Sequence, residues 1–476
     1  YGDHRDLHLS IRRQRQMCIR DRHINREKML TALRNFLTRR TIFAKIRNQT
    51  MNAFSSFEAF QVVRNKAETA RQEEKRPHEI LYFHKVDDPY SHLTIQCIEE
   101  LKSSFNIILK HVLVGEENLT AVHEPSLYNI YCLRDVKRIA PFYNMSFQSN
   151  EYPSKEMVEK ANSILTVVKD DNFGNIAMQV SDALWSNDIE ALDELSSTYY
   201  ATKIEVQEKL KQGNEIRNAK GYYFGSAFYY EKELYWGVDR LPYLEERLCQ
   251  LGAKNPMAPE NICPILSNAP HAFESEKKVN LYYYPSLNSP YTFISTERVR
   301  QIKEEYPVDL ITKPVLPMLM RMMTIPGFKA KYIISDAARE GRKHGHEMKS
   351  IYSPIGQPAR KSYSLFPVID EAGKGFEYIA ALLKASFQDG INIGDEVFLE
   401  NLVTDLELDW SIIKKDLNTR RWKKILNDNV EDMYTGNCWG VPSFKITDED
   451  GSNPFYVWGQ DRMWLLKEEI FKRLGN

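Results

Sequence analysis

Two stretches of the chain share one order of apolar and polar positions. Residues 80–101 read ILYFHKVDDPYSHLTIQCIEEL, and residues 279–299 read VNLYYYPSLNSPYTFISTERV. Each predicts an apolar, aromatic strand, a short polar turn and a helix that opens at Pro-Tyr, where proline costs no hydrogen bond. In the first stretch, the apolar residues after the turn fall on one helical face. They are Leu93, Cys97, Ile98, Leu101 and Phe105.

A second pair of similar stretches lies farther along the chain. Residues 228–248 read FYYEKELYWGVDRLPYLEERL, and residues 454–474 read PFYVWGQDRMWLLKEEIFKRL. Each predicts a strand, a W-G-x-D-R turn and an amphipathic helix. The apolar stripe of the last helix is Met463, Leu466, Ile470 and Leu474.

The spacing of these anchors predicts two tandem domains. Pro290 follows Pro89 by 290 − 89 = 201 residues, and Asp461 follows Asp239 by 461 − 239 = 222. In each part a strand-like segment follows the first helix, at 107–114 and 310–316, and a mostly helical stretch comes next. Strand, helix and strand in this order imply a right-handed parallel crossover, and the closing hairpin makes the sheet mixed. The predicted fold class is α/β, with two tandem thioredoxin-like domains that each have a small mixed sheet and a helical insertion.

The same reading divides the chain into five segments. Residues 12–22 read RRQRQMCIRDR, which resembles the conceptual translation of a sequencing adapter, so 1–22 is excluded from the fold prediction. Residues 23–78 are charged and predict a helical extension. The first domain is expected at 79–250 and the second at 279–476. The Pro-, Asn- and Gly-containing segment 251–278 predicts a linker.

Charge and cysteine content narrow the function classes. Lys and Arg total 64 against 65 Asp and Glu, which disfavours nucleic acid or an anionic membrane as a partner. No apolar run approaches the roughly 18 residues of a membrane span. The six cysteines contain no C-x-x-C pair, so a disulfide framework is not expected. This favours a reducing, cytoplasmic location.

Four motifs together resemble a known superfamily. They are N-S-P-Y at 288–291, G-V-P-S-F at 440–444, W-G-Q-D-R at 458–462 and PGFKAKYIISDAAREGRKHG at 326–345. They are similar to motifs of the DsbA-like thioredoxin superfamily, in particular its 2-hydroxychromene-2-carboxylate isomerase branch, which is related to kappa-class glutathione transferases. The resemblance covers nearly all of 279–476 and, more weakly, 80–250. It implies two tandem DsbA-like copies, a glutathione cofactor and a small unsaturated or aromatic acid as substrate.

Ser289 is the candidate catalytic residue. It stands where redox members of the superfamily carry their first cysteine, at the positive end of a predicted helix that lowers the pKa of a thiol. A serine offers no sulfur, so the resemblance implies that its hydroxyl holds the thiolate of glutathione, which adds reversibly to the substrate. The alternative is that Ser289 is simply a helix N-cap.

Two further candidates lie in the G-V-P-S-F motif. Pro442 matches the cis-proline loop of thioredoxin-like folds, so a cis Val441–Pro442 bond is expected. The backbone of Val441 would then pair with the peptide backbone of glutathione. The alternative is a trans proline at the start of an edge strand.

Gln460, Asp461 and Arg462 are candidates from the W-G-Q-D-R turn. By resemblance, this turn contacts the γ-glutamyl end of glutathione, and Asp461 takes its ammonium group. The competing interpretation is structural, because an aspartate at the start of a helix caps it and suits its dipole. The first domain has Asp239 and Arg240 at the matching place without the serine, which keeps both interpretations open.

Lys329 and Asn288 complete the candidate glutathione-binding residues. Lys329 precedes Tyr332 by three residues, as a ligand-contacting lysine does in the family, although a lone lysine is commonly a solvated surface charge. Asn288 orients a ligand or serves as a turn residue. No metal site is expected, because His344 and His346 have no obvious further ligands.

A repeated pair of charged residues predicts structural ion pairs. Asp336 and Arg339 recur as Asp135 and Arg138 in the first domain. An i,i+3 spacing at the start of a helix favours an ion pair within that helix.

The first domain lacks the thiol-site features. Asp88 takes the serine position and Ser226 takes the proline position. A carboxylate at this place repels a thiolate and raises its pKa, so the first domain is predicted to be catalytically silent.

Three functions stay open at this stage. The leading one is a glutathione-dependent isomerase or transferase that acts on a small molecule. The alternatives are a non-redox DsbA-like module that binds thiols or peptides, and a non-catalytic scaffold. The two domains are expected to pair with each other or to form a homodimer.

Overall fold

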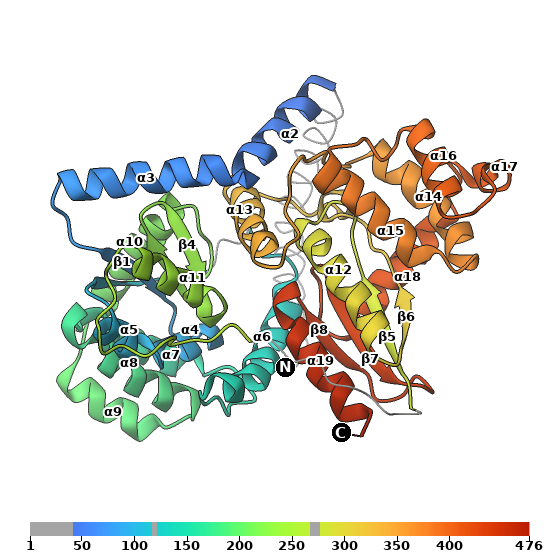
Figure 1. Cartoon of the computed structure of the whole chain (residues 1–476). Coiled ribbons are helices and arrows are strands. Elements are labelled where there is room, and N and C mark those ends of the chain that lie inside the picture. The colour runs from blue at the N-terminus through green and yellow to red at the C-terminus, as the bar shows by residue number, and fades with distance from the viewer. Residues whose placement is uncertain (1–40, 117–120, 267–276, 476) are drawn as a thin grey trace, which may run out of the picture.

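The computed structural model describes residues 41–116, 121–266 and 277–475. The predicted adapter segment 1–22 lies outside these ranges, as do residues 267–276 of the predicted linker. The described chain forms two mixed α/β parts, called here the first half (residues 79–250) and the second half (residues 279–475). They lie side by side in Figure 1.

Each half contains a four-stranded mixed sheet, as predicted. The strand order is β2-β1-β3-β4 in the first half and β6-β5-β7-β8 in the second. In both sheets the first two strands pair in parallel, and the remaining two join antiparallel as a hairpin. The strands are β1 Glu79–His84, β2 Ile108–Leu113, β3 Ala227–Tyr230, β4 Glu233–Trp236, β5 Val279–Tyr284, β6 Val308–Thr312, β7 Ser443–Asp448 and β8 Phe455–Trp458.

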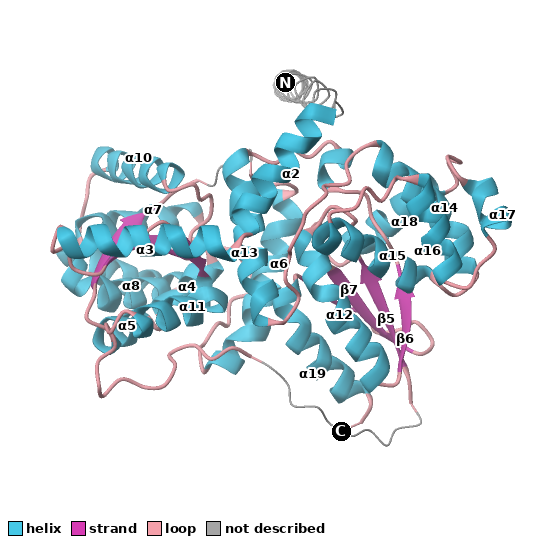
Figure 2. Ribbon diagram, turned by 45° about the horizontal axis from the view of Figure 1, so that its top comes forward, coloured by secondary structure: helices cyan, strands magenta, loops and turns pink. Residues whose placement is uncertain are grey.

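Helices surround both sheets (Figure 2). Those of the first half are α4 Pro89–Ile95, α5 Ile98–Ser104, α6 Pro125–Ile139, η1 Ala140–Tyr143, α7 Lys155–Val167, α8 Asp170–Trp185, α9 Ile189–Thr198, α10 Lys203–Ala219 and α11 Gly237–Gln250. Those of the second half are α12 Pro290–Glu305, η2 Met318–Arg321, α13 Gly327–Lys343, α14 Gln357–Glu371, α15 Gly375–Lys384, η3 Ala385–Asp389, α16 Glu396–Asp405, α17 Trp410–Ile413, η4 Lys414–Asp416, α18 Trp422–Thr435, η5 Gln460–Arg462 and α19 Met463–Arg473.

The first helix of the first half differs from the prediction. One apolar face was expected to continue to Phe105, but α4 ends at Ile95 and α5 begins at Ile98. Cys97 lies between them with φ −110° and ψ 3°, outside helical geometry. Its Sγ donates to the carbonyl of Thr94 at 3.1 Å. The apolar spacing is kept across the break, so all five predicted side chains are still buried.

Two N-terminal helices, α2 Thr41–Ser55 and α3 Phe57–Glu73, connect the halves from above in Figure 1. Helix α2 contacts the second half, where Asn52 Oδ1 accepts a hydrogen bond from the amide of Ile351 at 2.7 Å. The α3 side contacts the first half, where Arg64 forms an ion pair with Glu233 at 2.5 Å. The extension therefore holds both halves.

The halves also share side chains across their contact. Tyr131 of α6 packs with Tyr284 and Tyr456 of the second sheet. In return, Phe328 and Tyr332 of α13 pack with the cluster around Phe83 of the first sheet. Each half therefore places a helix against the sheet of the other.

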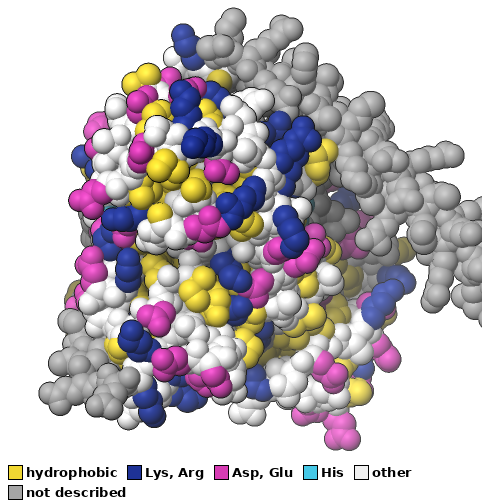
Figure 3. Space-filling model, turned by 90° about the vertical axis from the view of Figure 1, so that its right-hand side faces the viewer, with side chains coloured by type: hydrophobic (Ala, Val, Ile, Leu, Met, Phe, Trp, Pro, Cys, Tyr) yellow, Lys and Arg dark blue, Asp and Glu magenta, His cyan; other side chains and the backbone are white. Residues whose placement is uncertain are grey.

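The surface agrees with the even charge balance of the sequence. On the face seen in Figure 3, basic and acidic side chains are interspersed, with small apolar groups between them. Among the helices of the described residues, none is long and apolar enough to cross a membrane.

Candidate active site of the second half

Ser289 lies at the N-cap of α12, directly before Pro290. Its Oγ accepts a hydrogen bond from the amide of Thr292 at 3.1 Å. The same hydroxyl donates to the carbonyl of Val441 at 3.5 Å, which is at the long end of hydrogen-bond distances. The side chain is 8% exposed. Ser289 therefore acts as a cap and also faces the Val441–Pro442 loop.

The Val441–Pro442 peptide bond is cis, which confirms that prediction. The loop enters β7 under tight packing, because a Cβ on Gly440 would lie 2.4 Å from the indole Nε1 of Trp458. Ser443 Oγ donates back to the carbonyl of Gly440 at 2.7 Å. The G-V-P-S sequence thus combines a residue without a side chain, a cis bond and a hydroxyl that closes the turn.

Lys329 is buried where the two halves meet, and not on the surface. It is 5% exposed, and its ammonium group donates to the backbone carbonyl of Ala121 in the first half. The rings of Tyr223 and Trp439 each lie 5.4 Å from Nζ. Burial lowers the pKa of Lys329 to about 8. The lysine is therefore enclosed by residues of both halves, and its neighbour Trp439 precedes Val441 by two residues.

Sequence reasoning did not identify Thr292 and Trp439 at this site. Thr292 Oγ1 and Trp439 Nε1 are both buried, and neither has a hydrogen-bond partner among the described residues. Thr292 directly follows the N-S-P-Y motif and Trp439 directly precedes the G-V-P-S-F motif, so their only signal in the sequence was their place beside these motifs. Unpartnered buried polar atoms are uncommon in folded proteins, and a bound water, an ion or a catalytic role can account for them.

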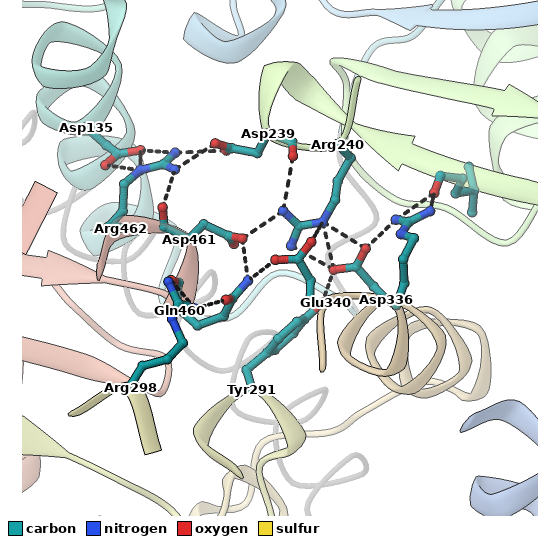
Figure 4. A network of polar contacts seen from close by, with 12 residues as sticks. Asp135, Asp239, Arg240, Tyr291, Arg298, Asp336, Glu340, Gln460, Asp461 and Arg462 are labelled. Atoms are coloured by element: carbon teal, nitrogen blue, oxygen red, sulfur yellow. Dashed lines mark hydrogen bonds and ion pairs between the residues drawn. The ribbon is translucent and has the colours of Figure 1, made fainter. Parts of the chain in front are cut away.

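The W-G-Q-D-R residues take part in contacts between the halves (Figure 4). Arg462 forms ion pairs with Asp135 and with Asp239 of the first half, each at 2.8 Å. Asp461 Oδ1 accepts from Arg240 at 2.7 Å. The ion-pair partners of Arg462 in this network are carboxylates of the other half, and its guanidinium also donates to the backbone carbonyl of Asp461 at 3.5 Å.

Gln460 belongs to the same network. Its Nε2 donates to Glu340 at 2.7 Å, and its Oε1 accepts from Arg298 at 2.7 Å. The cavity lined by Gln460 and Asp461 has a volume of about 50 Å³. This volume suits one or two water molecules and is too small for a tripeptide.

The first half contributes a matching set of contacts to this network. The Arg240–Asp336 pair forms one end of the network, and the Arg462–Asp135 pair forms the similar other end. Arg240 pairs with Asp336 of the second half at 2.9 Å, as Arg462 pairs with Asp135. Tyr291 donates to Asp336 at 2.8 Å, and Tyr90 donates to Asp135 at 2.7 Å. Each W-G-x-D-R arginine therefore reaches an aspartate on a helix of the opposite half.

This arrangement corrects one of the two predicted helical ion pairs. Asp336 and Arg339 do pair within α13. Arg138, however, donates to the backbone carbonyl of Tyr456 at 2.8 Å, while Asp135 accepts from Arg462. The i,i+3 rule considers neighbours on one helix, whereas Arg462 offers Asp135 a buried bidentate partner from another element.

Mutual electrostatics hold Arg462 and Asp336 of the network in their charged forms. Burial alone would lower the pKa of Arg462, but Asp135 and Asp239 raise it well above its ordinary value. Burial alone would raise the pKa of Asp336, but Arg240 and Arg339 bring it below its ordinary value. The ion pairs therefore stay ionised at neutral pH.

The corresponding place in the first half is built differently. Asp88 caps α4 and accepts from the amides of Tyr90 at 3.2 Å and Ser91 at 3.1 Å. Ser226, at the proline position, has φ 52° and its Oγ lies 2.6 Å from Thr94 Oγ1. A carboxylate and a serine thus stand where the second half has a hydroxyl and a cis proline.

The second half also matches a known family. Residues 280–471 match the model of the DSBA-like thioredoxin domain. The matched residues lie within the second half, which is therefore similar to a DsbA-like thioredoxin domain.

Solved structures of this fold are similar to part of the chain. 2-Hydroxychromene-2-carboxylate isomerase matches at 16% identity and a TM-score of 0.34, over 41% of this chain and 95% of its own. The cytosolic disulfide reductase DsbM from Pseudomonas aeruginosa matches at 16% identity and a TM-score of 0.34, over 41% of this chain and 100% of its own. DsbM with GSH is also similar, at 14% identity and a TM-score of 0.31, over 41% of this chain and 99% of its own. No curated protein matches the chain.

Proposed function

We propose that the DsbA-like domain binds glutathione beside Ser289 and acts as an isomerase or transferase on a small unsaturated or aromatic acid. The observation that carries this proposal is the position of the Ser289 hydroxyl. It lies at the N-terminus of α12 and within 3.5 Å of the backbone of the cis-proline loop. A ligand thiolate placed here would meet the positive end of the helix and a hydroxyl donor together.

The proposed chemistry begins with a change of hydrogen-bond partner. The Ser289 hydroxyl leaves the weakly held Val441 carbonyl and donates to the thiolate of glutathione. The thiolate adds to an activated carbon–carbon double bond and forms a C–S bond, while the electron pair of the double bond moves toward the acid's conjugated carbonyl. Rotation about the resulting single bond and elimination then break the C–S bond and return the thiolate.

The cysteines that the structure describes do not offer a competing dithiol site at this helix. Among the described residues, the cysteine nearest in sequence to the loop is Cys438, which is buried. Burial raises the pKa of its thiol to about 12, so it stays protonated at neutral pH. The sulfur for the proposed reaction therefore comes from the ligand.

We also infer that the first half is a degenerate copy of the second. The shared strand order and the two similar ends of the ion-pair network support this inference. In this view the first half closes the site of the second, because Ala121 and Tyr223 lie against Lys329.

The test is isothermal titration of the full chain with glutathione. We expect Ser289→Ala to weaken glutathione binding more than tenfold, because the hydroxyl donor to the thiolate is lost. Ser154→Ala is the matched control, since Ser154 caps α7 through the amide of Met157 at 3.2 Å. Both variants lose an N-cap worth about 1 kcal/mol, so only a ligand role separates them. Equal glutathione affinities in both variants would contradict the proposal.

A second candidate is a non-redox module that binds thiols or peptides without turnover. The observation that favours it is the use of Asp461 and Arg462 in contacts between the halves, which leaves the γ-glutamyl end of glutathione without its expected partners. In the same titration, binding of a short cysteine-containing peptide without binding of glutathione would select this candidate.

A further inference from the structure

A large groove lies under α3, away from Ser289. It has a volume of about 1240 Å³ and lies between α3, the outer face of the first sheet and α13. Figure 2 shows α3 running across the first half, with α10 on one side and α13 near one end. The volume exceeds that of an ordinary small-molecule pocket, so a long ligand fits.

The floor of the groove is an apolar row on the first sheet. Leu81 of β1 pairs with Tyr229 of β3, which pairs with Leu234 of β4. All three side chains line the groove and are half-buried.

The matching face of the second sheet is covered by a helix of its own half. There, Lys445 of β7 pairs in register with Tyr282, and its ammonium group reaches Asp432 of α18 at 2.7 Å. A helix of the same half therefore holds that face through an ion pair. On the first sheet, the apolar row instead lines the groove.

The roof of the groove is one face of α3. Phe60, Val63, Ala67 and Ala70 follow helical spacing and line the groove. Val63 is 47% exposed although it faces the sheet across the groove, so the roof does not close onto the floor. The ion pair of Arg64 with Glu233 holds α3 at this position.

Four lysines line the groove without a carboxylate partner among the described residues. They are Lys66, Lys220, Lys232 and Lys331. Every acidic residue of the lining is already engaged in an ion pair: Glu74 and Glu231 with Arg76, Glu79 with Lys110, Glu233 with Arg64, and Asp336 with Arg240 and Arg339. The charge that remains for a ligand is therefore positive.

We propose that this groove binds a carboxylate with a long, unbranched apolar chain, of the fatty-acid class. The chain would lie between the apolar row of the sheet and the apolar face of α3, with Phe328 and Tyr332 of α13 at one wall. The carboxylate would form an ion pair with one or more of the four lysines, which would then have an anionic partner. This binding is separate from the glutathione site and needs no glutathione.

The experiment is a fluorescence titration of the full chain with 11-(dansylamino)undecanoate, followed by displacement with dodecanoate. We expect saturable binding, and displacement that becomes about fourfold tighter with each methylene from octanoate to dodecanoate, as burial of each methylene in an apolar site requires. Absence of displacement, or affinity independent of chain length, would overturn the proposal.

Two neighbouring valines provide matched variants. Val63→Asp places a carboxylate inside the groove, and we expect it to weaken dodecanoate binding at least tenfold. Val62→Asp changes the next residue, which is 50% exposed and does not line the groove, and we expect unchanged affinity. Equal losses in both variants, with thermal unfolding showing both folded, would place the binding elsewhere and overturn the proposal.

The charged end of the ligand is tested separately. We expect dodecanol to displace the probe more weakly than dodecanoate, and at least one of the four Lys→Gln variants to weaken dodecanoate binding up to about fivefold, the range of an exposed ion pair. Equal displacement by alcohol and acid, or no effect of any lysine variant, would overturn the assignment of a carboxylate ligand.

Discussion

At the residue scale, Glu340 has an unusual place among the buried charges. It lies between Arg240, at 3.6 Å, and Gln460, which donates to it at 2.7 Å. Burial raises the pKa of Glu340. Arg240 opposes this rise, and the neighbouring Asp461 and Asp336 add to it. Among the carboxylates of the network, Glu340 is therefore one that folding makes harder to ionise.

This shift predicts how stability changes with pH. A carboxyl group whose pKa is raised by folding keeps its proton in the folded state after losing it in the unfolded state. The free energy of unfolding then falls as pH rises from the ordinary value of 4.5 toward the raised value. We expect Glu340→Gln to reduce this fall, measured by urea unfolding between pH 5 and pH 8. Glu246→Gln, an exposed change on α11, serves as the control. If the free energy of unfolding falls with pH as steeply in Glu340→Gln as in the unaltered protein, Glu340 is not the source of the fall.

At the element scale, the loop before β7 depends on close packing. A Cβ on Gly440 would meet the indole of Trp458, whose ring also packs against Trp439 and Tyr131. We expect Gly440→Ala to lower the free energy of unfolding by about 1–3 kcal/mol, as overpacking does, and to weaken glutathione binding through the displaced loop. Denaturant unfolding and calorimetric titration measure the two effects.

Gly327→Ala is the matched control for this element. Gly327 is the first residue of α13, and a Cβ there would meet nothing within 4 Å. Alanine favours a helix over glycine, so we expect an unchanged or slightly higher stability. A Gly440→Ala variant as stable as Gly327→Ala would show that the loop tolerates a larger residue.

The elements themselves were largely predictable from the sequence, because their signals are local. Strand periodicity, Pro-Tyr helix starts and W-G-x-D-R turns each occupy a few neighbouring residues, and the sheets and helices follow them. The cis bond at Val441–Pro442 was also predicted, from the flanking motif. The break at Cys97 was missed, since an apolar face can continue through a non-helical residue.

The partners of the charged residues were not predictable in the same way. Arg462 lies 327 positions from Asp135 along the chain, and no spacing rule connects them. Nothing in the sequence around Lys329 indicated that the carbonyl of Ala121, in the other half, would accept its hydrogen bond. Sequence patterns describe neighbours on one element, whereas these contacts arise from the packing of the two halves.

At the scale of the whole molecule, the two halves are joined by a continuous apolar core and by the two ends of the ion-pair network. One buried cluster includes Tyr82 and Leu241 of the first half together with Leu281 and Leu466 of the second. Because neither half can separate without exposing this cluster, we expect one cooperative unfolding transition for the full chain.

The arginines that cross between the halves give a sharp test of this coupling. Arg462→Ala leaves Asp135 and Asp239 buried without their shared cationic partner, and we expect it to lower the free energy of unfolding by about 3–5 kcal/mol while the transition stays single. Arg421→Ala removes an exposed ion pair with Glu371, and we expect a loss below about 1 kcal/mol. Denaturant unfolding followed by tryptophan fluorescence and by circular dichroism measures both variants. Two separate transitions in the unaltered protein would show that the halves unfold as independent units. Equal losses in the two variants would show that the crossing arginine contributes no more than an exposed ion pair.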